Sequence, residues 1–331
     1  MNGFVYVQTN DAEQNEVVVF GANGALERLG AHLTGGEGSG APHLPSQSSV
    51  VFDGSRLFVT NAGSNDVSVF VVDGAELRLL DRVPSGGSMP RSVAVHASWM
   101  YVLNTADEPN VAGLTVDGAR LGSCTLPQGS DPAQVAFSPD GSALLVTDRA
   151  TDSIHAFAVD ARGVARDRVT HRSSGVTPYG FDVTADGVVV VTEAAGAQLG
   201  KASASSYKLN GAAQLAPVSG AVGNTRSEVC WAVVSNDGRV AFVTNFGDGT
   251  ISTYAIGDDG SIELREAVAA TTVDGRPGIR DEAMSSDGQF LYALHSDTGR
   301  VFGWRVGDEG SLAAVGSANG LPPTAAGLAA S

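Results

Sequence analysis

The stretch PAQVAFSPDGSALLVTD, residues 132–148, decides the fold of this 331-residue chain. It consists of two short apolar runs joined by Ser138-Pro139-Asp140-Gly141. An Asp-Gly pair between apolar runs is a strong hairpin signal, because glycine accepts the positive φ that tight turns require. A third apolar run, residues 154–157, follows Asp148. The stretch therefore predicts three short antiparallel strands in succession.

The second run of this stretch, with its polar last residue, is one of seven similar runs along the chain. The spacings between the last residues are 51, 43, 44, 45, 52 and 50, a range typical of propellers and solenoids. Most copies carry an Asp-Gly or Asn-Asp-Gly turn before the run, whereas the third copy has His-Ala-Ser at 96–98. The seven last residues are Asn10, Asn61, Asn104, Asp148, Glu193, Asn245 and His295.

Each repeat also contains a short strand before the turn and two strands after the polar residue. Four antiparallel strands repeated seven times predict an all-β fold, a seven-bladed β-propeller in a single domain over residues 1–331. The chain starts on what is the second strand elsewhere, and residues 323–329 resemble the missing first strand. We therefore expect the N- and C-terminal strands to pair in one blade and close the ring, which removes a sheet edge.

The composition excludes several classes of partner. The 36 acidic residues outnumber the 20 Lys and Arg, for a net charge of −16, so nucleic acid and anionic membranes are not expected partners. The start of the chain resembles a strand rather than a signal peptide, which predicts a cytoplasmic protein. Cys124 and Cys230 form neither a disulfide framework nor a zinc motif, so we expect no metal and no cofactor. A small-molecule substrate remains the expected partner, and the oligomeric state stays open.

The inner hairpin of each repeat brings two polar positions to one rim of the central channel. A residue seven positions before the turn aspartate and one eight positions after it lie at the same end of two paired strands. A polar funnel at one end of a closed ring is where a ligand would bind. Besides the seven last residues, the rim positions are Ser46, Arg91, Ala133, Tyr179, Cys230, Arg280 and Thr324, with the neighbours Gln47, Ser92, Gln134, Gly180, Trp231, Asp281 and Ala325.

Several of these residues have a structural interpretation as well as a functional one. Asn and Asp at strand ends commonly cap turns, which is the expected role of most of the last residues. Glu193 and His295 are poor turn formers, so each is a candidate for acid-base chemistry or for a salt bridge. Arg91 and Arg280 could bind an anion or link adjacent blades. Tyr179 and Trp231 could pack between blades, and for Trp231 this is the favoured interpretation.

The repeated pattern Pro-x-x-x-x-x-(Ser/Thr)-x-Asp-Gly, a strand and Thr-Asn resembles the seven-bladed propeller lactonase family over nearly the whole chain. That family includes bacterial 6-phosphogluconolactonases and fungal carboxymuconate lactonising enzymes. The resemblance implies a site at four positions, which the family fills with histidine, arginine, glutamate and arginine. Here these positions hold Ala133, Tyr179, Glu193 and Phe246.

The resemblance therefore implies a lactonase-like enzyme with a rebuilt site at the channel mouth. It would hydrolyse, form or isomerise a small lactone or related cyclic metabolite by proton transfer and oxyanion support, without a metal. The catalytic candidates are Glu193 as general base or proton shuttle, with Tyr179 and His295 as donor or acid. The candidates for substrate binding are Arg91, Arg280, Gln134, Trp231, Asp281 and Phe246. The alternative is a non-catalytic propeller that binds a small molecule or a protein. A metal- or quinone-dependent dehydrogenase fits less well, because no metal-ligand spacing is visible.

Overall fold

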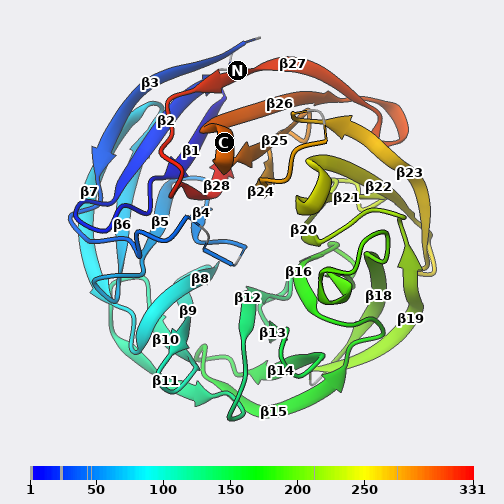
Figure 1. The fold of residues 1–331 in the computed structure, drawn as a ribbon. Coiled ribbons are helices and arrows are strands. Elements are labelled where there is room, and N and C mark those ends of the chain that lie inside the picture. The colour runs from blue at the N-terminus through cyan, green and yellow to red at the C-terminus, as the bar shows by residue number, and fades with distance from the viewer. Residues whose placement is uncertain (1–2, 23–24, 43, 46, 212, 274) are drawn as a thin grey trace.

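The computed structural model describes residues 3–331 apart from 23–24, 43, 46, 212 and 274, and these residues form a ring of seven four-stranded antiparallel sheets (Figure 1). We number the blades from the closing one: blade 1 is β28-β1-β2-β3, blade 2 is β4 to β7, and so on to blade 7, β24 to β27. In every blade the first strand lines the central channel and the last lies on the outside of the ring (Figure 1). This arrangement confirms the predicted fold class.

The strands follow the predicted repeat. The channel-lining strands are β28 (Ala326–Ala330), β4 (Val50–Phe52), β8 (Ser88–His96), β12 (Pro132–Phe137), β16 (Pro178–Val183), β20 (Val229–Val234) and β24 (Ile279–Met284). The second strands are β1 (Phe4–Gln8), β5 (Arg56–Asn61), β9 (Trp99–Ala106), β13 (Ala143–Asp148), β17 (Val188–Glu193), β21 (Val240–Asn245) and β25 (Phe290–His295).

The outer half of each blade is more exposed. The third strands are β2 (Glu16–Ala22), β6 (Asp66–Asp73), β10 (Asn110–Thr115), β14 (Ser153–Val159), β18 (Ser203–Asn210), β22 (Thr250–Ile256) and β26 (Arg300–Val306). The outermost strands are β3 (Leu26–Leu33), β7 (Glu76–Pro84), β11 (Arg120–Thr125), β15 (Ala165–Arg172), β19 (Gln214–Gly223), β23 (Ile262–Thr271) and β27 (Leu312–Asn319). Four 3-10 segments complete the described elements: η1 (Ala195–Ala197), η2 (Phe246–Asp248), η3 (Ser296–Thr298) and η4 (Asp308–Gly310).

The two ends of the chain close the ring, as predicted. Strand β28 pairs antiparallel with β1, with Val5 opposite Ala330 and Val7 opposite Leu328. The strand begins at Ala326 rather than earlier, because Thr324 lies in a turn where its hydroxyl donates to the Thr9 carbonyl at 2.8 Å. Blade 1 therefore depends on strands from opposite ends of the chain.

The hairpin turns between first and second strands use the predicted chemistry. Gly141 has φ +70°, and the Ser138 hydroxyl donates to the Asp140 carboxylate at 2.7 Å. In the third copy, where glycine is absent, Ala97 adopts the left-handed conformation with φ +53°. These six turns lie on one face of the ring, which we call the turn face; the opposite face, where the channel-lining strands begin, is the mouth face.

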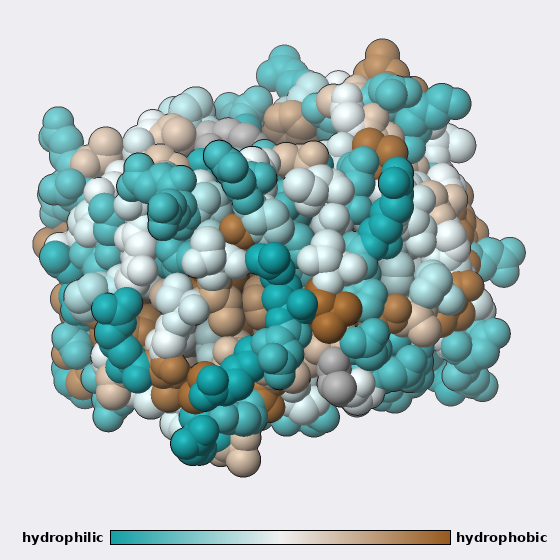
Figure 2. Space-filling model, turned by 90° about the horizontal axis from the view of Figure 1, so that it is seen from below, coloured by the Kyte–Doolittle hydropathy of each residue, from teal (hydrophilic) through white to brown (hydrophobic). Residues whose placement is uncertain are grey.

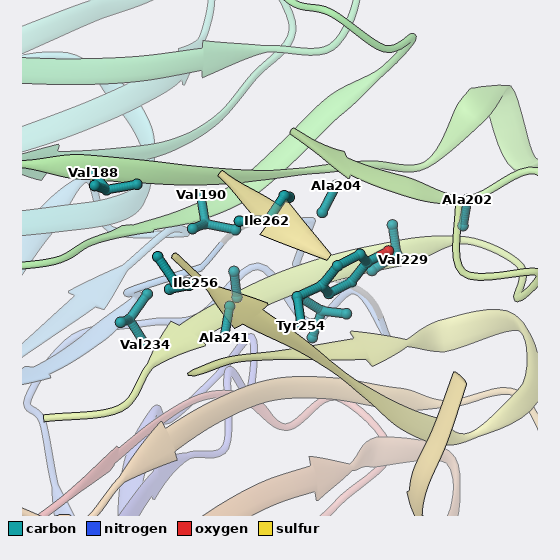
Figure 3. Packing of buried hydrophobic residues seen from close by; sticks show 12 residues of the cluster. Val188, Val190, Ala202, Ala204, Val229, Val234, Ala241, Tyr254, Ile256 and Ile262 are labelled. Atoms are coloured by element: carbon teal, nitrogen blue, oxygen red, sulfur yellow. The ribbon is translucent and has the colours of Figure 1, made fainter. Parts of the chain in front are cut away.

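The hydrophobic core lies between the blades rather than inside one layer. Figure 3 shows one such cluster, in which Val188 and Val190 of blade 5 face Ala241, Tyr254 and Ile262 of blade 6. Similar clusters of buried side chains lie between the other neighbouring blades. Each blade is thus stabilised mainly by its two neighbours, so the closure of the ring matters to all of them.

The outside of the ring mixes hydrophilic and hydrophobic residues. The side view in Figure 2 shows hydrophobic residues scattered among hydrophilic ones. In the part of the chain that the structure describes, no helix has the length and apolar character needed to cross a bilayer.

Candidate functional site

An aromatic and apolar cluster lies on one side of the channel at the mouth face. It joins Ala133, Tyr179, Cys230 and Trp231, from the starts of the channel-lining strands of blades 4, 5 and 6, and Phe246 packs against it. The Tyr179 and Trp231 rings meet edge to face, with centroids 5.6 Å apart. Three of the predicted site residues, Tyr179, Trp231 and Phe246, are therefore brought together.

Tyr179 connects this cluster to two arginines. The Arg149 guanidinium lies 4.8 Å from the centre of the Tyr179 ring and forms a 2.6 Å ion pair with Asp131. Burial raises the pKa of the Tyr179 phenol, so the group is protonated at neutral pH and is a hydrogen-bond donor. Arg91 is close enough for its charge to act on both Tyr179 and Arg149, and burial lowers the pKa of Arg91.

Arg280 approaches the same cluster from blade 7. Its guanidinium stacks 4.8 Å from the centre of the Phe246 ring, hydrogen-bonds to the Ser296 hydroxyl and lies 3.5 Å from an Asp297 carboxylate oxygen. The side chain is 7 % exposed, and burial lowers its pKa despite the nearby Asp297. Arg149 and Arg280 thus each lie over a ring of this cluster, and the charge of Arg91 acts on Tyr179. In such a partly buried environment a positive charge acts strongly on a bound anion.

Glu193 lies inside blade 5, behind this cluster. Its carboxylate accepts hydrogen bonds from the Ser203, Ser205 and Ser173 hydroxyls at 2.8, 2.5 and 3.1 Å and from the Gly175 N–H at 2.8 Å. Burial raises its pKa in spite of these donors. The carboxylate therefore ties the segment that leads into Tyr179 to the third strand of the blade.

In other blades too, the polar residue that ends the second strand is buried, and together these residues form a polar layer. Asn61 donates to Ser68 at 2.7 Å, Asn245 donates to Ser252 at 2.9 Å, and Asp148 contacts His155 at 3.2 Å. Asn61 and Asn245 thus bond to third-strand side chains rather than to the turn backbone, whereas Asp148 also accepts from the Ala150 N–H at 3.2 Å, as a turn cap does. His295 belongs to this layer too: one ring nitrogen, Nδ1, lies 3.2 Å from the Thr298 hydroxyl, and burial lowers its pKa, so the ring is neutral.

Gln134 and Asp281 line the channel below the cluster and hold neighbouring blades together. The Gln134 amide accepts from the Phe181 N–H at 2.7 Å and donates to the Phe181 carbonyl at 2.9 Å. Asp281 accepts from the Leu328 N–H at 3.1 Å. Both side chains point from one channel-lining strand to the next.

Gln47 makes the same contact across the channel. Its amide donates to the Ala232 carbonyl at 2.7 Å and accepts from the Ala232 N–H at 3.2 Å, although Gln47 precedes blade 2 and Ala232 belongs to blade 6. Blade 5 has Gly180 at the position that Gln134 holds in blade 4, so it has no side chain to reach blade 6. Gln47 takes that role and supplies the side chain that bonds to blade 6.

The remaining rim positions are structural or lie outside the description. Ser46 lies outside the described residues. Burial raises the pKa of the Cys230 thiol, and Cys124 is half-buried with a raised thiol pKa as well. Among the described residues, no group of three or more His, Cys, Asp and Glu side chains is arranged to hold a metal ion.

Arg149 is not among the site residues predicted from the sequence. A signal was present, because Arg149 follows Asp148 just as Phe246 follows Asn245, one residue beyond the polar end of a second strand. The position repeats in every blade, and only the side chain that fills it differs.

Similarity to known proteins agrees with the fold. The family described as lactonase, 7-bladed beta-propeller, matches residues 3–121, 115–196 and 189–284. The chain belongs to this lactonase family. No curated protein matches this lactonase-family chain significantly.

Solved structures share the fold of this lactonase-family chain at low sequence identity. A Lactobacillus plantarum protein is 15 % identical, with a TM-score of 0.77 over 100 % of both chains. A candidate 6-phosphogluconolactonase from Bacteroides fragilis is 16 % identical, with a TM-score of 0.74 over 100 % of this chain and 98 % of its own. The periplasmic gluconolactonase PpgL of Pseudomonas aeruginosa is 18 % identical, with a TM-score of 0.73 over 99 % of this chain and 98 % of its own.

Proposed function

We propose that this chain opens or closes the ring of a small lactone, or isomerises a related cyclic metabolite, at the mouth face of its propeller. The observation that carries the proposal is the convergence of Arg91, Arg149 and Arg280 on the aromatic cluster around Tyr179. Family membership supports the reaction class.

In the hydrolytic direction, water adds to the lactone carbonyl carbon and the ring C–O bond breaks. The ring oxygen takes a proton, and the new carboxylic acid releases one at neutral pH. A desolvated guanidinium stabilises the oxyanion that forms on the carbonyl oxygen and then the carboxylate product. The protonated Tyr179 phenol is the donor for the leaving ring oxygen. Neither step requires a metal or a redox cofactor.

The other candidates take supporting roles in this proposal. Glu193 orients the segment before Tyr179 through its hydrogen bonds to Ser173 and Gly175. The neutral His295 ring lies near Arg280. Trp231 and Phe246 offer apolar surface to the ring of the substrate. The apolar and aromatic residues at three of the four family positions favour a substrate less charged than a sugar phosphate.

The test is proton release at constant pH from a panel of γ- and δ-lactones, phosphorylated and not. Replacing Arg280 by Gln or Tyr179 by Phe should lower kcat at least about 100-fold, since each removes a group that acts on developing charge. Glu193→Gln separates the two roles of this residue: a general base would lose kcat with unchanged stability, whereas a positioning group would lose both. Arg162→Gln, an exposed residue far from the mouth, is the matched control. Failure to turn over any lactone would refute the hydrolytic proposal.

A second candidate function is binding without catalysis. The observation in its favour is that Arg149 and Arg280 already have carboxylate partners, Asp131 and Asp297. Such pairs can hold a rim rigid without any chemistry. A ligand that raises the melting temperature of the wild type but not of Arg280→Gln, in the absence of turnover, would support this function instead.

A further inference from the structure

Arg149 is held at the mouth by the residue that precedes the channel-lining strand of its own blade. Its guanidinium forms a 2.6 Å ion pair with the Asp131 carboxylate, and its Nε–H donates to the Asp131 carbonyl at 3.4 Å. Its backbone N–H donates to the same carbonyl at 3.1 Å. The Arg149 side chain is only 15 % exposed, so these contacts rather than solvent set its direction. Where the guanidinium meets the Tyr179 ring therefore depends on where Asp131 lies.

The fully buried carboxylate of Asp148 fixes both sides of this ion pair. Its oxygen Oδ1 accepts from the Asp131 N–H at 2.9 Å and from the Ala150 N–H at 3.2 Å. Asp131 is the residue that pairs with Arg149, and Ala150 is the residue that follows it. One carboxylate oxygen therefore joins the two chain segments that carry the Asp131–Arg149 pair.

The other carboxylate oxygen, Oδ2, is held from within the blade. It lies 2.8 Å from the Thr151 hydroxyl, which donates to it, and 3.2 Å from Nε2 of the buried His155 ring on β14. The second ring nitrogen, Nδ1, lies 3.1 Å from the Thr170 hydroxyl on β15. Burial alone would raise the pKa of Asp148, but hydrogen bonds from His155 and the other donors outweigh it and hold this pKa well below its usual value. The ionised carboxylate has no proton to donate, so Nε2 of His155 is the donor.

Other blades build the polar layer with an uncharged pair. Where blade 4 has aspartate and histidine, two blades have asparagine and serine: Asn61 with Ser68 in blade 2, and Asn245 with Ser252 in blade 6. The oxygens of these two asparagines accept from side-chain amides, those of Asn15 and Asn224. Asparagine and serine are therefore enough to build the layer, and what the charged pair of blade 4 adds is its hold on the backbone beside Arg149.

We propose that Asp148 is a positioning residue, which fixes the Arg149 guanidinium against the Tyr179 ring. It acts through backbone N–H groups on both sides of the ion pair and touches no substrate, and His155 holds its carboxylate in the required orientation. Glu193 accepts from the backbone before Tyr179 in the same way, so each half of the Arg149–Tyr179 contact rests on a buried carboxylate of its own blade. Any effect on catalysis rests on the proposed function, whereas the contact itself exists without a substrate.

NMR spectra of the ligand-free protein test the position of Arg149 directly. The ring current of Tyr179 should shift the Arg149 Nε–H proton upfield, relative to its position in Tyr179→Leu, where the ring is absent. Arg149→Lys identifies the signal by its loss. In Asp148→Ala most of the upfield shift should disappear, because the two backbone segments are released. Asp148→Asn should restore most of it, because the amide oxygen can still accept from both N–H groups.

Asn61→Ala is the matched control, because it empties the same position of the polar layer two blades away. It should lower stability without moving the Arg149 signal. If Asp148→Ala does not fold, His155→Ala replaces it and should move the signal in the same direction, since the carboxylate loses the donor that orients it. An Arg149 signal that stays at its wild-type position in the folded variant, or that moves equally in Asn61→Ala, would overturn the proposal and leave Asp148 a structural role only.

The kinetic arm uses a lactone that the wild type turns over. Asp148→Ala should lower kcat for this lactone at least about tenfold, because a displaced guanidinium loses much of its action on the transition state, whereas Asn61→Ala should leave kcat unchanged. A displaced Arg149 signal with unchanged kcat would overturn the catalytic part of the inference. No turnover by the wild type would refute the proposed function instead, and the NMR spectra would still decide whether Asp148 positions Arg149.

Discussion

The contact of Gln47 across the channel can be tested by removing its amide. Gln47→Ala deletes two hydrogen bonds to Ala232, whose backbone N–H and carbonyl are fully buried. Each bond contributes about 1 kcal/mol net, and a buried group left without a partner costs about 1–3 kcal/mol. We expect the free energy of unfolding to fall by about 2–4 kcal/mol. Gln134→Ala removes the same pair of bonds between neighbouring blades, so it should cost a similar amount.

Gly180→Ala tests the same contact from the opposite side. A Cβ at Gly180 would lie less than 3.0 Å from the Gln47 amide oxygen and from the Cys230 carbonyl oxygen, so it displaces Gln47. The loss should be about as large as in Gln47→Ala. The double variant should cost at least about 1 kcal/mol less than the sum, because the same two bonds cannot be lost twice.

Urea unfolding followed by tryptophan fluorescence measures these differences, with Gly220→Ala as the control. Gly220 lies on an outer strand with no heavy atom near its hypothetical Cβ, so this change should stay within about 0.5 kcal/mol of the wild type. Strict additivity of Gln47→Ala and Gly180→Ala would refute the argument that Gln47 replaces the side chain missing at Gly180.

Three other predictions concern pH, ring closure and a contact between blades. Burial raises the pKa of Asp281 from 3.8 to about 7, so between these pH values the folded state binds more protons than the unfolded state and the free energy of unfolding should fall as the pH rises from 4 to 7. Urea midpoints measured across this range should show a flatter slope for Asp281→Asn. An unchanged slope would contradict the assignment. Deleting residues 326–331 removes β28 and exposes the edge of β1, so the free energy of unfolding should drop by about 5 kcal/mol or more. A truncated chain with the wild-type melting temperature would disprove closure by this strand. Tyr101→Phe removes a phenolic hydroxyl that donates to the Gly163 carbonyl at 2.8 Å and accepts from the Ala165 N–H at 2.7 Å. Calorimetry should show that the free energy of unfolding falls by about 1–3 kcal/mol. No change would mean that water replaces both bonds.

The repeat predicted the architecture because each strand is a local pattern. Apolar runs bounded by Asp-Gly turns identify the second strands, and the structure places their ends within two residues of the prediction; the first strand, for example, ends at Gln8 rather than at Asn10. The ring closure was also predictable, since a missing strand at one end of the chain matched an extra one at the other. The pattern was less accurate at Thr324, which it placed in the closing strand. Pro322 and Pro323 precede Thr324 and keep it in a turn before β28.

The environment of each rim residue was less accessible to sequence reasoning. Glu193 ends a strand at a rim position, yet its partners Ser203 and Ser205 lie on the next strand and draw it into the blade. Gln47 and Ala232 are 185 residues apart, and no local pattern links them. Such contacts depend on the closed ring and not on any single repeat.

The sevenfold repeat explains how a site can be rebuilt without a change of fold. The family pattern places one arginine where this chain has Tyr179 and another where it has Phe246. In this chain arginines occupy the equivalent positions of other blades, with Arg280 in blade 7 and Arg149 in blade 4. Because all seven blades direct these positions to the same mouth, moving a guanidinium from one blade to another keeps the charge at the channel and changes only its direction. Under the proposed function, such a rearrangement would change the shape of the accepted substrate while keeping the class of reaction.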